Sequence, residues 1–439
     1  MTTADGTSTL AQRPAATFQP GNLPGTDAVV SVNSLKRYQR FSGVGASLTG
    51  ASAALIGDLA PAGRKKLMAQ LFSRTEGAGL SVLRQPLGPS DFSVSRQSYD
   101  PATPGQTDRA LRQFSLGSDA TTVLPLVRQA QQLNRSLMVV ATPWSAPAWM
   151  KTSDNLIGGT LRPDMAEPYA RYLARSLQAY RDAGVAVGAM TLQNEPNFSP
   201  PGYPGMTLSV SQQRRLLDTY LSPELARAGL TPALWGLDDN FSRAADAAAL
   251  VADPVTRGHL AGIAFHCYKG AAAQMGVFRD AHPDVPVAIS ECTSGGWADT
   301  FSQALTWDVR NLLITGIRSG ATWVTKWNVA LDPTGGPKNG GCQDCRGLLT
   351  IDPTTGAVTR NADYWALAHV GRFVMPGADV IDSTNQPGGI ETVAFANADG
   401  SHVLLATNAG RGDTSFRVRA DQGWFRYTLA AGAVATFTW

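Results

Sequence analysis

The stretch VAVGAMTLQNE at residues 185–195 decides the fold, because it reads as a buried β-strand that ends in a glutamate. Its apolar residues form a continuous run, as in strands of a parallel sheet that are covered on both faces. The segment before it is an amphipathic helix in which Tyr169, Leu173 and Leu177 recur every four residues. Gly184 supplies the stop at the end of that helix. Helix and strand together form the repeating unit of an α/β fold.

Working outward from this stretch, strand-like runs alternate with helix-like segments along most of the chain. We expect eight strands, at residues 41–47, 80–86, 136–144, 185–195, 233–239, 262–268, 285–291 and 321–328. Eight strands separated by helices predict a closed (β/α)8 barrel, which takes roughly 250 residues. A doubly wound open sheet is the alternative fold.

The pattern of residue types along the sequence changes near residue 377. ETVAFANADG, SHVLLATNAG and TSFRVRAD are short, β-branched segments separated by Asn, Asp and Gly turns, a pattern typical of an antiparallel sandwich. TLAQRP, DAVVSVN and KRYQRF near the N-terminus look similar and are expected to add strands to it. We therefore predict a catalytic barrel at 41–375 and a side β-sandwich built from 1–40 plus 376–439.

Two glutamates follow predicted strands in similar contexts, Glu195 in TLQNEPNF (191–198) and Glu291 in AISECTSG (288–295). The C-terminal ends of barrel strands meet at one rim, which is where barrel enzymes place their catalytic groups. A glycosidase needs two carboxylates that face each other across a sugar. The pair therefore predicts glycoside hydrolysis, with a non-catalytic carbohydrate-binding protein as the alternative from another class.

Composition and charge exclude several other functions. With 43% hydrophobic and 16% charged residues among 439, the chain has the composition of a globular protein. Its formal net charge is +3 and its longest basic run is RKK at 64–66, so no nucleic-acid partner is expected. No stretch of about 18 apolar residues is present, so we expect no transmembrane segment.

The four cysteines indicate whether the protein works in an oxidising or a reducing compartment. Cys342 and Cys345 stand two residues apart in GGCQDCRG, which favours a local disulfide and an oxidising environment. Cys267 and Cys292 stand singly in strand-like segments, so a four-cysteine zinc site is disfavoured. Four reduced thiols remain the alternative. MTTADGTSTLAQRP at the N-terminus shows neither the charged nor the apolar region of a signal peptide. We expect a secreted protein in its mature form, with a cytoplasmic protein as the alternative.

Seven blocks of sequence together resemble glycoside hydrolase family 30, which includes glucosylceramidases and endo-β-1,6-glucanases. In order they are FSGVGASLTGASAALI, VLRQPLGPSDFS, ATPWSAPAWMKT, TLQNEP, AFHCY, ISECT and WNVALDPTGGP. The resemblance runs from about residue 8 to Trp439. It implies a barrel with a side sandwich, retaining chemistry, and no metal or organic cofactor. It also implies that Glu195 is the acid/base and Glu291 the nucleophile.

Residues next to the two glutamates are expected to support them. Asn194 can hydrogen-bond the sugar 2-hydroxyl or the nucleophile. His266 and Tyr268 end the sixth predicted strand, where we expect Tyr268 to donate to Glu291 and His266 to support one of the glutamates. The H-x-Y spacing matches no metal-ligand pattern, which disfavours a zinc hydrolase.

Other candidates come from the second, third and eighth strands. Arg84 can pair with a catalytic carboxylate, and Asp91 can accept hydrogen bonds from sugar hydroxyls. Flat indole faces stack on pyranose rings, so Trp144 and Trp327 are predicted to bind the sugar. Trp149 and Trp297 are weaker candidates for the same role, since tryptophan is also a common core residue.

The substrate is predicted by resemblance alone. HCY, ECT with GGW, and the CQDC loop look more like the microbial branch that acts on β-1,6-glucan than the branch that hydrolyses lipids. We therefore expect a monomeric endo-β-1,6-glucanase whose partner is its carbohydrate substrate. A glucosylceramidase or an exo-β-glucosidase is the alternative.

Overall fold

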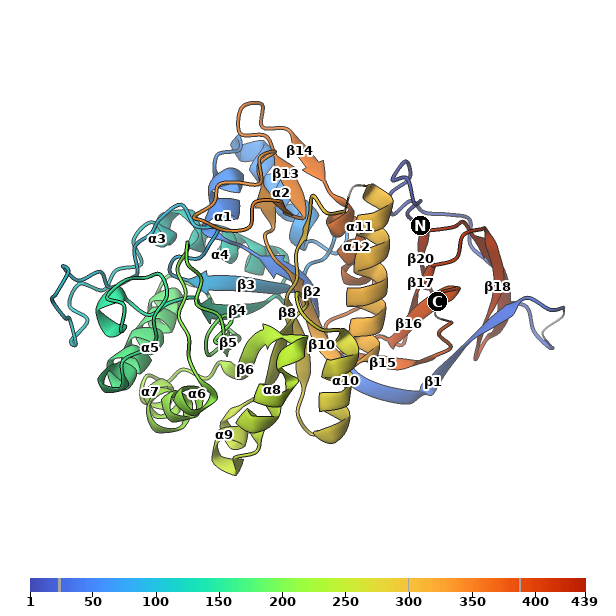
Figure 1. Ribbon diagram of the computed structural model, residues 1–439. Helices are drawn as coiled ribbons and strands as arrows, with labels where there is room; N and C mark the ends of the chain where they lie inside the picture. Colours follow the sequence, from blue (N-terminus) through green and yellow to red (C-terminus); the bar gives the residue numbers. More distant parts are fainter. Residues whose placement is uncertain (23–24, 299, 387) are drawn as a thin grey trace.

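The computed structural model describes residues 1–22, 25–298, 300–386 and 388–439. Eight parallel strands close into a barrel in the order β10-β2-β3-β4-β5-β6-β7-β8, which confirms the barrel and excludes the open sheet (Figure 1). The strands are β2 (Gly43–Ser47), β3 (Val82–Leu87), β4 (Met138–Pro143), β5 (Ala189–Thr191), β6 (Ala233–Asn240), β7 (Gly262–His266), β8 (Val287–Glu291) and β10 (Ala321–Lys326). Each falls within or beside a strand that the sequence predicted.

Helices cover the outside of the barrel (Figure 1). They are α1 (Gly50–Gly57), α2 (Pro61–Phe72), α3 (Asp119–Thr122), α4 (Leu124–Leu133), α5 (Ala166–Asp182), α6 (Val210–Arg215), α7 (Ser222–Arg227), α8 (Ala244–Val251), α9 (Pro254–His259), α10 (Ala272–Ala281), α11 (Phe301–Trp307) and α12 (Ala362–Gly371). The apolar stripe of α5 is buried as predicted, with Tyr169, Leu173 and Leu177 at most 2% exposed. Within the described residues, no helix is long and apolar enough to cross a membrane.

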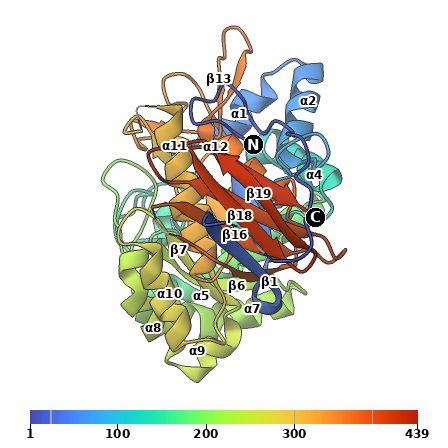
Figure 2. The same cartoon turned by 90° about the vertical axis from the view of Figure 1, so that its right-hand side faces the viewer.

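A seven-stranded sheet forms the side sandwich, in the order β19-β18-β1-β15-β16-β17-β20. Its strands are β1 (Ala28–Phe41), β15 (Ala378–Ser383), β16 (Ile390–Ala396), β17 (His402–Asn408), β18 (Thr414–Ala420), β19 (Gly423–Leu429) and β20 (Val434–Thr438). β1 pairs in parallel with β18 at its start and antiparallel with β15 further on, so one N-terminal strand joins both halves (Figure 2). The expected strand at TLAQRP is wrong, because that segment makes no ladder.

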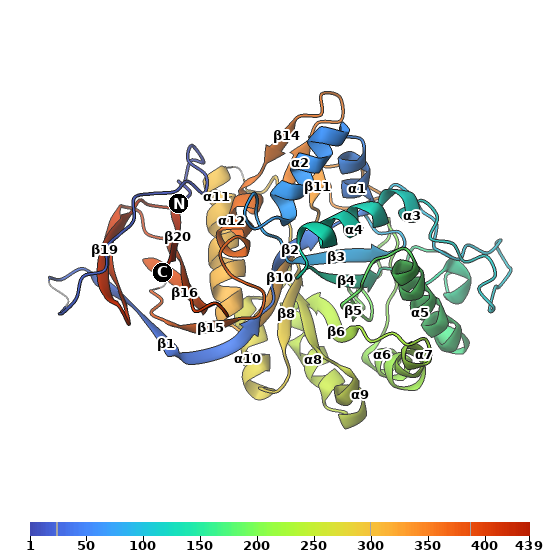
Figure 3. The ribbon, with the colours of Figure 1, turned by 180° about the vertical axis from the view of Figure 1, so that it is seen from behind.

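The sandwich packs directly against the barrel through α11, α12 and the helical segment Asp308–Gly316. In Figure 3, α11 and α12 lie between the barrel strands and the sandwich. Arg310 makes a two-pronged ion pair with Glu391 of β16, at 2.9 and 2.6 Å. His369 of α12 lies 2.8 Å from the hydroxyls of both Thr2 and Thr436, so both chain ends contact the same helix.

Two small sheets are built from the loops that follow β8 and β10. β11 (Ala330–Leu331), β13 (Leu349–Ile351) and β14 (Val358–Arg360) form one of them. β12 (Cys345–Arg346) and β9 (Ser294–Gly295) form the other, which ties the CQDC loop to the loop after Glu291. These additions stand on the rim where the predicted site residues lie.

A buried lysine fixes the last barrel strand to the helices outside it. Nζ of Lys326 in β10 lies 2.6 Å from Asp308 and 2.8 Å from Asp363 of α12, and it donates to Ser294 at 2.7 Å. The lysine and both aspartates are at most 1% exposed. Charges this deeply buried are stable only while they are paired.

Replacing this lysine should therefore be costly. Lys326→Met leaves the buried Asp308 without its cation and leaves Asp363 with Arg346 at 3.6 Å, and we expect it to lower the free energy of unfolding by about 3–5 kcal/mol in urea titrations. Lys36→Met is the matched control, because Lys36 pairs with Asp382 at the surface and should cost at most about 1 kcal/mol. Equal losses for the two variants would contradict the role given to Lys326.

Candidate active site

The structure gathers the predicted polar residues at the C-terminal end of the barrel. Arg84 lies within β3, His266 ends β7 and Glu291 ends β8. Asn194 and Glu195 follow β5, which is the fourth strand of the barrel, while β8 is the seventh. The two glutamates therefore approach each other across the mouth of the barrel.

Glu291 is held by two donors. Nη1 of Arg84 lies 2.5 Å from its Oε2, and the hydroxyl of Tyr268 donates to its Oε1 at 2.7 Å. Only 7% of the Glu291 side chain is exposed. Burial raises the pKa of the Glu291 carboxyl, and the positive charges of His266 and Arg84 oppose that rise.

Glu195 is the more exposed carboxylate, with 17% of its side chain accessible. Nδ1 of His266 lies 3.3 Å from Oε1 of Glu195 and 4.0 Å from Oε1 of Glu291, so these two oxygens are at most 7.3 Å apart. One imidazole therefore stands within reach of both carboxylates.

The strand that leads to Glu195 is shorter than the sequence predicted. β5 ends at Thr191, and Glu195 has a positive φ of 43°, which lies outside the β region. Backbone hydrogen bonds hold the turn instead: Asn194 N–H donates to Pro143 at 2.9 Å and Glu195 N–H donates to Asp238 at 2.9 Å. The glutamate thus projects from a turn fixed between the ends of β4 and β6.

Asp238 is a central residue that sequence reasoning missed. Its fully buried carboxylate lies 2.9 Å from Nη2 of Arg84 and 3.1 Å from Nε2 of His266, and it accepts a hydrogen bond from Ser290 at 2.6 Å. Burial alone would raise the pKa of Asp238, but Arg84, His266 and Ser290 hold it well below its usual range. The two adjacent aspartates that end ALWGLDD were the available signal.

His266 is a cation in this setting. Burial lowers its pKa, but the negative charge of Glu291 and the hydrogen bonds to Asp238 and Glu195 raise it to about 10. A protonated imidazole donates from both nitrogens. His266 therefore donates to Asp238 on one side and to Glu195 on the other.

Arg84 also contacts Asn194 and two tryptophans. Its Nη2 also donates to Oδ1 of Asn194 at 2.7 Å. Its guanidinium lies 4.8 Å from the ring of Trp144 and 5.6 Å from that of Trp327, and the two indoles stack on each other at 5.0 Å. Trp144 and Trp327 are only 2% and 3% exposed. Both rings pack against Arg84 at the base of the site, and their contact with a sugar stays a prediction.

Asp91 lies in the loop after β3, close to both glutamates. Burial and the negative charges of Glu291 and Glu195 raise its pKa well above the usual range. Its Oδ1 is buried without a hydrogen-bond partner among the described residues. Asn339 N–H donates to the Asp91 carbonyl at 2.6 Å, so the loop before Cys342 contacts this residue.

Two further aromatic residues, which the sequence analysis did not select, stand beside Glu195. The rings of Phe198 and Tyr203 lie 6.5 Å apart, and Phe198 is 44% exposed. Burial and the negative charges of Asp91 and Glu195 raise the pKa of Tyr203. By contrast, Trp149 is buried and donates to the Asp100 carbonyl at 3.0 Å.

The structure contains two disulfides. Cys342 is joined to Cys345 within the CQDC loop. Cys267 is joined to Cys292, a pairing that the sequence did not indicate because the two residues are 25 positions apart. No cluster of three or more His, Cys, Asp or Glu suited to a metal ion occurs in the described part of the chain.

Two family models match the chain. The model of the glycosyl hydrolase family 30 TIM-barrel domain matches residues 41–374. The model of the glycosyl hydrolase family 30 β-sandwich domain matches residues 377–437. Together they cover the barrel and the C-terminal part of the sandwich.

Several known proteins are similar to this chain over most of their length. The endo-1,6-β-D-glucanase of Neurospora crassa is 29% identical over 410 residues, which cover 88% of this chain and 82% of that protein. The lysosomal acid glucosylceramidase of Mus musculus is 28% identical over 442 residues, covering 95% and 84%. The solved endo-β1,6-glucanase BT3312 superposes with a TM-score of 0.92 at 28% identity, covering 100% of this chain and 98% of that one.

The charge on His266 makes a testable contribution to stability. Because its pKa is raised from 6.5 to about 10, this contribution is fully present below pH 6.5 and is lost as the pH rises through 10. The difference in unfolding free energy between wild type and His266→Gln should therefore shrink from pH 7.5 to pH 9.5, by up to about 1.4 kcal/mol per pH unit. Urea titrations at three pH values measure it.

His369→Gln is the matched control. Burial lowers the pKa of His369 to about 3, so this histidine is neutral in folded and unfolded chains across the same pH range. Its difference from wild type should stay constant between pH 7.5 and pH 9.5. A constant difference for His266→Gln as well would show that His266 is not protonated in the native protein.

Proposed function

The chain belongs to glycosyl hydrolase family 30, and on that basis we propose that it is a retaining endo-β-1,6-glucanase with Glu291 as nucleophile and Glu195 as acid/base. The observation that carries this proposal is the pair of carboxylates on either side of His266, at most 7.3 Å apart. Retaining enzymes separate their carboxyl groups by roughly 5–5.5 Å, whereas inverting enzymes need roughly 6.5–9.5 Å. The upper limit on the distance between the Glu195 and Glu291 oxygens is therefore shorter than most carboxyl separations of inverting enzymes.

Their surroundings support different roles for the two glutamates. A nucleophile must be ionised and fixed in direction, and Arg84 and Tyr268 both donate to Glu291. An acid/base must exchange protons with a leaving group and then with water, and Glu195 is the more accessible carboxylate. These contacts favour nucleophilic attack by Glu291 and proton transfer by Glu195.

Glu195 must change its role between the two steps. In the first step Glu195 gives its proton to the leaving oxygen as the glycosidic bond breaks, while Glu291 forms an ester with the anomeric carbon. In the second step water attacks the anomeric carbon, the ester bond to Glu291 breaks, and Glu195 accepts a proton from that water.

Neighbouring groups can bind the sugar. Because the amide oxygen of Asn194 accepts from Arg84, its NH2 group is left to donate to the sugar 2-hydroxyl. The unpartnered oxygen of Asp91 can accept from another hydroxyl. Phe198 and Tyr203, beside Glu195, offer aromatic surface for the sugar on the leaving-group side.

The choice of β-1,6-glucan follows from the relatives. The Neurospora crassa protein and BT3312 are both endo-β-1,6-glucanases, and the second matches the entire chain with a TM-score of 0.92. The mouse lysosomal relative covers 95% of the chain, so glucosylceramide is the second candidate substrate. Two disulfides support secretion into an oxidising compartment.

Product analysis tests the substrate. The protein is incubated with linear β-1,6-glucan, an aryl β-glucoside and glucosylceramide, and the products are separated by chromatography. We expect gentio-oligosaccharides of several lengths from the glucan, with the β-configuration retained at the new reducing end when NMR follows the first minutes. Glucose from the small glucosides alone would contradict the endo-glucanase and favour glucosylceramide or an exo-β-glucosidase.

Leaving-group ability tests the two carboxylates separately. Glu195→Gln should lower kcat/KM by about 10²- to 10⁴-fold for glycosides with poor leaving groups, and by less than about 10-fold for a 2,4-dinitrophenyl β-glucoside, which needs no acid. Glu291→Gln should abolish turnover of both, by about 10⁴-fold or more. Steady-state kinetics and a melting curve measure this.

The exposed Glu76→Gln is the control for loss of a carboxylate and should match wild type. Equal losses on good and poor leaving groups in Glu195→Gln would overturn its acid role. Turnover by Glu291→Gln near that of wild type would overturn the nucleophile.

A further inference from the structure

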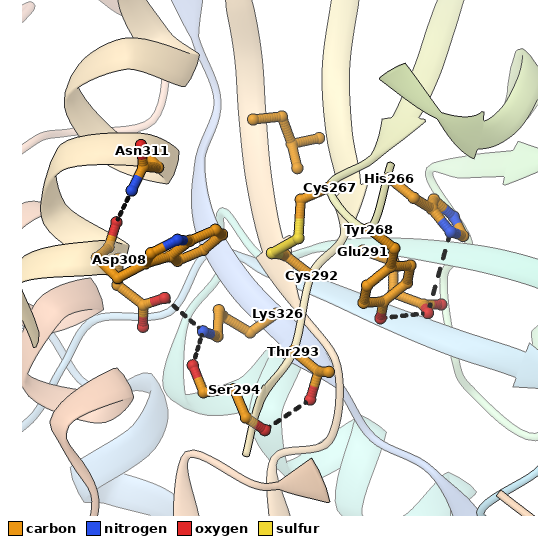
Figure 4. Close-up of a disulfide and its surroundings, with 12 residues drawn as sticks. His266, Cys267, Tyr268, Glu291, Cys292, Thr293, Ser294, Asp308, Asn311 and Lys326 are labelled. Atoms are coloured by element: carbon orange, nitrogen blue, oxygen red, sulfur yellow. Dashed lines mark hydrogen bonds and ion pairs between the residues drawn. A yellow bond between two sulfur atoms is a disulfide. The ribbon is translucent and has the colours of Figure 1, made fainter. Parts of the chain in front are cut away.

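The Cys267–Cys292 disulfide joins two residues that are direct neighbours of the catalytic cluster. Cys267 stands between His266 and Tyr268 in the chain, and Cys292 follows Glu291. Figure 4 draws the disulfide between the Tyr268–Glu291 contact on one side and Lys326 on the other. Resting on the proposed function, we propose that this disulfide is a positioning device that holds the Tyr268 hydroxyl against the Glu291 carboxylate.

The ladder between β7 and β8 ends where this contact begins. Its register shifts between Phe265 and His266, and the last strand pair is His266 with Glu291. One more backbone bond follows, from Cys267 N–H to the Glu291 carbonyl at 3.2 Å. Tyr268 lies beyond it and is 40% exposed. The disulfide is the next link between the two strands.

The Cys292 half of the bridge is fixed by the barrel. Cys292 is fully buried, and its carbonyl accepts from Trp327 N–H at 2.7 Å. Trp327 directly follows β10, in which Lys326 is held by its two buried aspartates. Cys267 is only partly buried. The covalent link therefore ties the less buried side of the contact to a residue that is fully buried in the barrel.

Hydrogen bonds of Lys269 hold the chain on the other side of Tyr268. Lys269 N–H donates to Asn240 at 2.8 Å, and Ser242 N–H donates to the Lys269 carbonyl at 3.1 Å. These bonds fix the chain one residue after the tyrosine, while the disulfide fixes it one residue before. Loss of the bridge leaves the residue before the tyrosine held to β8 by its N–H bond to the Glu291 carbonyl, at 3.2 Å, so the Tyr268 hydroxyl gains freedom to move away from Glu291.

The consequence of that movement is electrostatic. Burial raises the pKa of Glu291, and the hydrogen bond from Tyr268 lowers it. The other charged or titratable groups around Glu291 are Arg84, Asp91, Glu195, Tyr203, Asp238 and His266. Among these groups, His266 alone is a chain neighbour of a bridged cysteine, and its hydrogen bond to Asp238 does not depend on the disulfide. Removing the bridge should therefore raise the pKa of Glu291 through Tyr268.

The test compares two double variants, each lacking one disulfide. C267A/C292A should lower kcat about 10-fold, leave KM within about 2-fold, and move the acid limb of the kcat/KM profile up by roughly half to one pH unit. C342A/C345A loses a disulfide of the rim loop and should keep the acid limb of wild type. A lower kcat with an unmoved acid limb in C267A/C292A would show a merely structural bridge and overturn the proposal.

A double-mutant cycle with Tyr268→Phe identifies the residue through which the bridge acts. Y268F should move the acid limb in the same direction, and combining it with C267A/C292A should add no further shift, because both changes remove one contact. Independent, additive shifts would overturn the proposal. If Y268F leaves the acid limb in place, the role given to Tyr268 in the proposed function is wrong and the bridge proposal falls with it.

A second measurement covers the case in which C267A/C292A does not fold. Folded C342A/C345A, whose remaining disulfide is Cys267–Cys292, is treated with a phosphine reductant, and thiol titration and near-UV circular dichroism confirm reduction without unfolding. The same acid-limb shift is expected, and none would overturn the proposal. Each test compares variant and wild type on the same substrate. The result therefore holds even if the preferred substrate is a β-glycoside other than β-1,6-glucan.

Discussion

The site depends on one buried cation, the guanidinium of Arg84. It is fully buried among Glu291, Asp238 and Asn194, with the stacked Trp144 and Trp327 against its face. A charge in such a place is tolerable only when every partner is in position, and each carboxylate needs the cation equally. Strands β3, β6 and β8 must therefore close correctly before any of these charges is stable, which couples the shape of the barrel to the chemistry of its rim.

The backbone around this cation is strained where function requires it. Glu195, Leu237, Asp238 and Asn328 all have positive φ, although none is glycine. Such residues cost of order 1–3 kcal/mol each and persist only where their surroundings fix them. Here the strain turns Glu195 out of the strand direction toward the barrel mouth and turns Asp238 inward, beneath the two glutamates. The paired charges at the centre of the barrel stabilise this arrangement.

Much of this could be predicted from the sequence. The eight barrel strands could be predicted because each lies in an apolar run that the local sequence shows. Glu195 and Glu291 follow two of these runs. Asp238 was missed because its role arises from a bulge in β6 that turns it inward, and local sequence does not show a bulge. The Cys267–Cys292 pairing was missed because it depends on β7 and β8 being neighbours, a property of the closed barrel. The burial of Trp144 and Trp327 likewise depends on where Arg84 packs, which the sequence does not show.

The strand β1 has a consequence for how the protein is made. It is made before the eight barrel strands, yet its partners β15 and β18 are made after them, and 337 positions separate Phe41 from Ala378. At about 5–20 residues per second, translation takes roughly 15–70 s to reach them. During that interval both edges of β1 are open to other chains, while the barrel can already close. The edges of β1 are thus protected only after the barrel strands, β15 and β18 have all been made.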